Sequence, residues 1–121
     1  MSKRHDIDFI QDIKQSIENI FDYIGKMNYE EFLNDKKTKD AVVHNLEIIG
    51  EATKNISEIL KTNHSYIPWK QLAGIRDKIA YFYFGIDYKI VWNIMKKQLP
   101  ILHNDMEKIE RRELFDDING K

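Results

Sequence analysis

The spacing of apolar residues near the start of the chain constrains the fold more than any other feature. These residues recur at steps of three and four, and they are Ile7, Ile10, Ile13, Ile17, Ile20, Phe21 and Ile24. Because an α-helix makes one turn every 3.6 residues, this spacing places them all in one stripe. The stripe predicts a long amphipathic helix over residues 6–26 that must bury one face against other helices.

Two further segments show the same helical periodicity. Residues 42–60 carry an apolar face, and Gly50 within them is expected to mark a close contact with another helix. The next helix is expected to begin at Pro68, because a proline at the first helical position loses no hydrogen bond. It is expected to run to Phe84 and to end at Gly85, since glycine readily adopts the left-handed conformation that ends many helices.

A fourth helical segment follows Asp87, whose side chain suits an N-cap. Its apolar stripe consists of Val91, Met95, Leu102, Met106 and Ile109. Pro100 lies inside this segment and is expected to kink it, because proline removes one helical hydrogen bond and crowds the preceding turn. With no repeat and no linker, residues 1–121 are predicted to form one domain, an all-α antiparallel four-helix bundle.

Composition limits the partners and cofactors of such a bundle. The sequence has 19 Lys and Arg against 20 Asp and Glu, a formal net charge of −1, so any contact with a nucleic acid must be local. It has no cysteine and no Gly-rich phosphate loop, and its four histidines lack metal-ligand spacing. The pair His44 and Glu47 reverses the Glu-x-x-His order of di-iron sites. We therefore expect no metal and no cofactor.

The sequence also lacks targeting signals. The N-terminus has no apolar segment of the kind found in signal peptides. The longest uncharged apolar run, IAYFYFGI, is too short to span a membrane. We expect a cytoplasmic protein without a membrane contact.

The stretch GIRDKIAYFYFGI, residues 74–86, places an arginine shortly before four aromatic residues. On a continuous helix, one apolar arc would face the bundle core, and a second arc would comprise Ala73, Ala80, Tyr81 and Phe84. A helix that is apolar on two sides must bury both of them. This pattern predicts a homodimer through the second arc; the alternative is that helices of the same chain cover both arcs.

Arg76 and Tyr83 are seven residues apart, which places them on one side of such a helix, at the seam between the two arcs. Burying an unpaired guanidinium is costly. Two arrangements satisfy it: an ion pair with Asp77, Glu47 or Glu51, or exposure to a cleft that receives an anion.

Three blocks of sequence resemble the HepT-like group of the HEPN superfamily in their order and spacing. They are VVHNLEIIGEATK, PWKQLAGIRDKIAYFYFGID and the VW that follows, and together they cover nearly the whole chain. The resemblance implies an all-α dimer that acts as a metal-independent ribonuclease toxin. It also implies a small nucleotidyltransferase antitoxin, often called MntA, as the partner, and RNA as the substrate.

The signature of that group is Arg, four residues, His, one residue and Tyr. Arg76 and Tyr83 occupy its first and last positions here, but Tyr81 stands where the group has histidine. The resemblance implies that Arg76 binds the scissile phosphate and that Tyr83 receives AMP from the antitoxin. A tyrosine with a pKa of about 10 is a poor general base at neutral pH, although it can still act as an acid or a hydrogen-bond donor.

Two interpretations follow from this substitution. In the first, the protein is a ribonuclease toxin regulated by adenylylation, with activity weakened at residue 81. In the second, it is a catalytically inactive helical dimer that binds a nucleotidyltransferase and is modified by it. A third, an RNA-binding scaffold, is disfavoured by the near-neutral charge.

Overall fold

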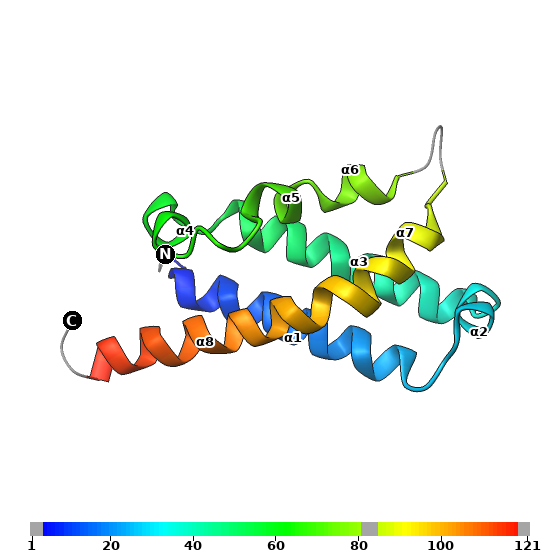
Figure 1. The fold of residues 1–121 in the computed structure, drawn as a ribbon, viewed down its shortest axis with the longest axis horizontal. Helices are drawn as coiled ribbons and strands as arrows, with labels where there is room; N and C mark the ends of the chain where they lie inside the picture. Colours follow the sequence, from blue (N-terminus) through cyan, green and yellow to red (C-terminus); the bar gives the residue numbers. More distant parts are fainter. Residues whose placement is uncertain (1–3, 81–84, 119–121) are drawn as a thin grey trace.

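The structure is a computed structural model that describes residues 4–80 and 85–118, and its architecture is an all-α bundle (Figure 1). Its elements are α1 (Asp6–Ile24), α2 (Tyr29–Leu33), α3 (Lys36–Lys54), α4 (Glu58–Asn63), α5 (Trp69–Ala73), α6 (Ile75–Ile79), α7 (Tyr88–Asn93), the π-helical turn η1 (Ile94–Gln98) and α8 (Leu99–Ile118). The predicted all-α class is confirmed.

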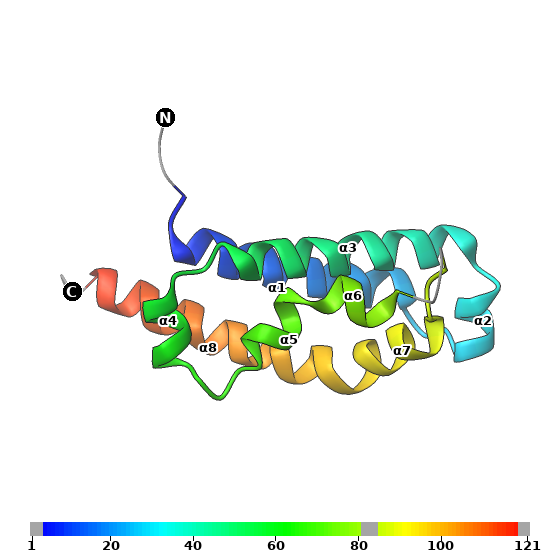
Figure 2. The same cartoon turned by 90° about the horizontal axis from the view of Figure 1, so that it is seen from above.

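Four segments of this series form the bundle. Figure 1 shows that α1, α3, the α5–α6 segment and the α7–η1–α8 segment run in alternating directions. Helix α1 packs against α3 and α8, whereas α5 and α6 pack against α3. Helix α6 also contacts α7, so the four segments enclose one core (Figure 2).

The apolar stripes read from the sequence form that core. Four isoleucines of α1 are fully buried, and they are Ile10, Ile13, Ile17 and Ile20. The stripe predicted for the last segment is buried as well, from Val91 to Ile109. The hydrophobic effect acting on these faces therefore drives the long helices together, and long helices with one apolar face are the part of the fold that periodicity predicts well.

The helix expected over residues 42–60 is interrupted, so that prediction is wrong in its length. Helix α3 ends at Lys54, and Ser57 starts α4 because its side chain accepts a hydrogen bond from the Leu60 amide. Ser57 is also tied to α1, since its amide and its hydroxyl donate to the Asp6 carboxylate at 2.9 and 2.5 Å. Serine at an N-cap favours a new helix over continuation of the old one.

The single helix expected over residues 68–84 is also wrong. Pro68 is the N-cap of α5, Gly74 separates α5 from α6, and α6 ends at Ile79. Ala80 is extended (φ −69°, ψ 132°) and forms an isolated antiparallel bridge with Ile86. In addition, the Asp87 amide donates to the Ile79 carbonyl at 2.8 Å. These backbone bonds satisfy groups that a continuing helix would have used.

This break also removes the helical geometry behind the predicted second arc. Ala73 is half-buried on α5, whereas Ala80 is exposed and extended, so the two do not share one helical face. Tyr81 and Phe84, the other residues of that arc, lie outside the described residues. Gly85 does not end a helix either, because α6 stops six residues earlier, at Ile79.

Two local predictions on glycine and aspartate are confirmed. A Cβ added at Gly50 would lie 3.1 Å from Ile75 Cγ2 and 3.4 Å from the Leu72 carbonyl oxygen, so α3 and the α5–α6 segment pack closely there. Asp87 caps α7, since its carboxylate accepts hydrogen bonds from the Lys89 and Ile90 amides. The first contact positions the α5–α6 segment, which carries Arg76, and the second positions α7.

The last helical segment departs from regular α-helix just before Pro100. In η1 the Leu99 amide donates to the Ile94 carbonyl, five residues back. Pro100 has no amide hydrogen to donate to the Lys96 carbonyl, so a π-helical turn next to it is physically reasonable. The predicted kink at Pro100 stays a prediction.

Candidate functional site

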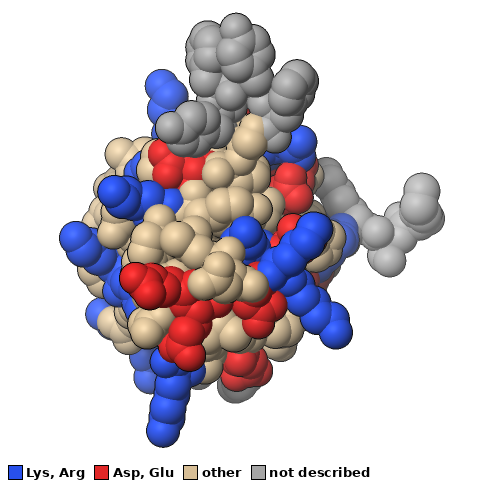
Figure 3. Space-filling model, turned by 90° about the vertical axis from the view of Figure 1, so that its right-hand side faces the viewer, with Lys and Arg blue, Asp and Glu red and all other residues tan. Residues whose placement is uncertain are grey.

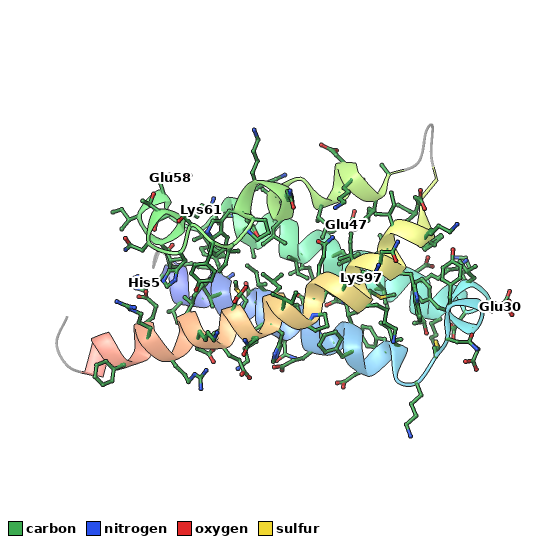
Figure 4. The ribbon with its side chains drawn as sticks, in the orientation of Figure 1. His5, Glu30, Glu47, Glu58, Lys61 and Lys97 are labelled. Atoms are coloured by element: carbon green, nitrogen blue, oxygen red, sulfur yellow. The ribbon has the colours of Figure 1, made fainter. Side chains whose placement is uncertain are left out.

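Arg76 is a predicted site residue whose side chain the structure presents to solvent. It lies on α6 between Ile75 and Ile79, which are 3% and 0% exposed and anchor α6 in the core. The close contact at Gly50 fixes this helix against α3. The Arg76 side chain points outward, is 78% exposed, and donates a hydrogen bond to Glu47 of α3. Figure 4 labels Glu47 in the middle of the bundle.

The Arg76–Glu47 pair forms part of the wall of an open groove of about 390 Å³. The groove is lined by Arg4, Asp12, His44, Glu47, Ile48, Glu51, Ala52 and Arg76. These residues come from α1 and the segment before it, from one face of α3, and from α6. The site is therefore assembled from three parts of the chain that are far apart in sequence.

Two guanidinium–carboxylate pairs set the electrostatics of the groove. Arg4 donates to Asp12 at 2.8 Å, and this hydrogen bond raises the pKa of Arg4 above its ordinary value. The Arg76–Glu47 pair is largely exposed to solvent, and exposed pairs of this kind contribute on the order of 0–1 kcal/mol. A phosphate group can therefore compete with Glu47 for Arg76, and guanidinium binds phosphate bidentately.

The structure gathers some of the predicted site residues and leaves others apart. Glu47 and Glu51 both line the groove with Arg76, and Glu51 also accepts a hydrogen bond from Lys54 at 3.4 Å. Both arrangements considered for Arg76 are combined here, an ion pair with an acid and an open groove. Asp77 is exposed on α6 and does not line the groove. Tyr81 and Tyr83 lie outside the described residues.

Sequence reasoning missed three polar residues of this groove, Arg4, Asp12 and His44. Arg4 and Asp12 reach it only because α1 packs along α3, and no local pattern near them indicates this. His44 is exposed and sits three residues before Glu47, so both lie on the same face of α3. The His44-x-x-Glu47 spacing is the sequence signal for this shared face.

Charge is mixed elsewhere on the surface. At the end of the bundle that carries α2 and α7, acidic side chains lie between groups of Lys and Arg side chains (Figure 3). Over residues 4–80 and 85–118, no three His, Asp or Glu residues are grouped so that they could hold a metal ion. In the same part of the chain, no helix is long and apolar enough to cross a membrane.

Fold and groove together define an all-α bundle with an exposed arginine beside an open groove. Residues 13–109 match the family described as Ribonuclease HepT-like. This match covers most of the chain, and the chain belongs to the HepT-like ribonuclease family.

Several relatives of similar length support this assignment. "Putative RNase MJ0127" of Methanocaldococcus jannaschii is 42% identical over 113 residues, which is 93% of this chain and 89% of the relative. "Probable ribonuclease HepT" of Thermococcus cleftensis is 42% identical over 109 residues, 90% of this chain and 99% of the relative. "Putative RNase MJ1216" of M. jannaschii is 42% identical over 121 residues, 100% of this chain and 96% of the relative. No solved structure matches the chain.

Proposed function

We propose that this protein is an RNA endonuclease in which Arg76 binds the scissile phosphate. The observation that carries the proposal is the Arg76 side chain, 78% exposed in an open groove of a HepT-like chain. A guanidinium stays charged at every physiological pH and stabilises the charge that develops on the phosphate during cleavage. RNA cleavage through the 2′-hydroxyl needs no metal, so we propose a metal-independent reaction.

We further propose that the protein is the toxin of a toxin–antitoxin pair and acts in the cytoplasm as one domain. Its antitoxin would be an MntA-type nucleotidyltransferase that transfers AMP to Tyr83. The support for this is the motif, in which Arg76 and Tyr83 keep the family spacing. Adenylylation would add a bulky anion seven residues from Arg76 and thereby compete with RNA for the positive charge.

We propose a homodimer whose interface includes Ala80. Its side chain is exposed within the motif, directly after α6, and the groove around Arg76 is open, so a second copy has room to pack there. Ala80→Arg is expected to give monomers and to abolish RNA cleavage, because like charges would face each other across a two-fold axis. Sedimentation velocity and a cleavage assay check this, with Lys70→Arg as the surface control. A fully active monomer would contradict the proposal.

The second candidate function is a catalytically inactive dimer that binds a nucleotidyltransferase and is modified by it. The observation that favours it is Tyr81 at the position of the family histidine. A phenol is ionised in roughly one molecule in a thousand at pH 7, so it accepts protons poorly.

One substitution separates the two functions. Tyr81→His is expected to raise RNA cleavage by about tenfold or more over the wild-type protein, because histidine transfers protons near neutral pH. Both proteins are assayed on single-stranded RNA in EDTA, and host growth is followed during expression. If both proteins are folded and neither cleaves RNA, the ribonuclease proposal is wrong and the second function is favoured.

A further inference from the structure

We infer that His44 of α3 is the general base of this protein and takes the role that the motif histidine has elsewhere in the family. The inference rests on the proposed ribonuclease function. Cleavage through the 2′-hydroxyl requires a group that removes its proton, and histidine is the residue type best suited to this near neutral pH. The chain has tyrosine at the motif position, so the base must come from another residue.

His44 is in the right place to act on a phosphate held by Arg76. It lies three residues before Glu47 on α3, and side chains at this spacing have Cβ atoms about 5–6 Å apart. Glu47 in turn accepts a hydrogen bond from Arg76 across the same groove. A phosphodiester that replaces Glu47 on the guanidinium would therefore lie beside the imidazole.

His44 is also free to react. Its side chain is exposed, and within the described residues it makes no hydrogen bond or ion pair. Two other histidines are engaged: His64 contacts the Tyr66 hydroxyl at 3.2 Å, and His103 contacts the Glu18 carboxylate at 2.8 Å. A catalytic base must be accessible and uncommitted before the substrate arrives, and His44 meets both conditions.

The charges that face His44 are mostly paired with each other. They belong to Arg4 and Asp12 at α1, Glu47 and Glu51 on α3, and Arg76 on α6. Arg4 is bound to Asp12, and Arg76 to Glu47, so two cations and two anions offset one another. Glu51 is the remaining carboxylate of the groove, and its partner is Lys54. Asp40, one turn before His44 on α3, is paired with Lys36. No single sign of charge therefore dominates around the imidazole.

The chemical step balances with these groups and solvent. The neutral imidazole of His44 accepts the proton of the 2′-hydroxyl, and the 2′-oxygen forms a bond to phosphorus. The bond between phosphorus and the 5′-oxygen breaks, and that oxygen leaves with a proton from solvent. The products are a 2′,3′-cyclic phosphate and a 5′-hydroxyl. Arg76 stabilises the extra charge on the phosphate oxygens throughout.

The test compares cleavage of a fluorescent mixed-sequence single-stranded RNA in EDTA by wild-type protein and His44→Gln. We expect wild-type activity to decline at acid pH. We expect His44→Gln to lower kcat/KM by roughly 10²–10⁴-fold and to abolish that decline. His44→Ala should regain activity when imidazole is added. His103→Gln is the matched control, because it removes a histidine far from the groove and should keep the wild-type pH profile.

The outcomes separate this inference from the proposed function. If wild-type protein and His44→Gln cleave equally with the same pH profile, His44 is not the base, and the ribonuclease proposal stands. If wild-type protein is inert but Tyr81→His cleaves RNA, the role of His44 is overturned. The ribonuclease proposal then holds only for the motif with histidine at position 81. If all three proteins are folded and inert, both proposals are wrong. The His44 variants could also lose activity while imidazole fails to rescue His44→Ala and the residual activity of His44→Gln still declines at acid pH. That result would assign His44 a structural role and overturn the inference.

Discussion

Replacing Arg76 with alanine is expected to lower RNA cleavage by roughly 10²–10³-fold while leaving the fold intact, because the variant removes the cation that meets the phosphate. The side chain is 78% exposed and its ion pair with Glu47 is solvent-accessible, so little stability depends on it. The measurements are kcat/KM on single-stranded RNA and thermal unfolding followed by circular dichroism.

Two further variants sharpen this prediction. Arg76→Lys keeps the charge but loses the planar pair of donors, so its activity should lie between those of wild type and Arg76→Ala. Lys78→Ala removes an exposed cation from the same short helix, and Lys78 does not line the groove. Equal losses in Lys78→Ala and Arg76→Ala would mean that α6 contributes only general positive charge, and the assignment of Arg76 to the phosphate would be abandoned.

Phe32→Ala is expected to have the largest effect on stability, a loss of about 3–5 kcal/mol in the free energy of unfolding. The Phe32 ring is fully buried and lies against Tyr88 and Trp92, with ring centroids 6.0 and 5.4 Å away. It fixes the short helix α2 to α7, and its loss would leave a cavity between them. Urea denaturation followed by circular dichroism gives the change.

The control for Phe32→Ala is Ile59→Ala. Ile59 is 76% exposed on α4, so its truncation should change the free energy of unfolding by less than about 0.5 kcal/mol. Phe32→Leu keeps most of the apolar volume and should fall between the two. If Phe32→Ala is as stable as Ile59→Ala, the contact between α2 and α7 does not hold this end of the bundle.

The long helices could be predicted from sequence because their apolar residues repeat with the helical period over many turns. The breaks could not, since each depends on a partner outside the helix that ends or begins there. Ser57 starts α4 while bound to Asp6, 51 residues earlier, and α6 ends where the Ile79 carbonyl accepts from the Asp87 amide. Local propensity contains no information about such partners.

Part of the candidate site could also be predicted from helical periodicity. Glu47 and Glu51 are one turn apart on α3, so their common face follows from the helical period, and the motif indicated Arg76. The contribution of Arg4 and Asp12 required knowing that α1 packs along this face. The spacing of His44 and Glu47 predicts that they share a face of α3. That His44 also lies in a groove with Arg76 follows only from the folded chain.

The backbone contacts between Ile79 and Asp87, and between Ala80 and Ile86, join the end of α6 to the start of α7. They are made by main-chain amide and carbonyl groups, which every residue carries apart from the missing amide hydrogen of proline. The closure of this junction therefore requires no particular side chain.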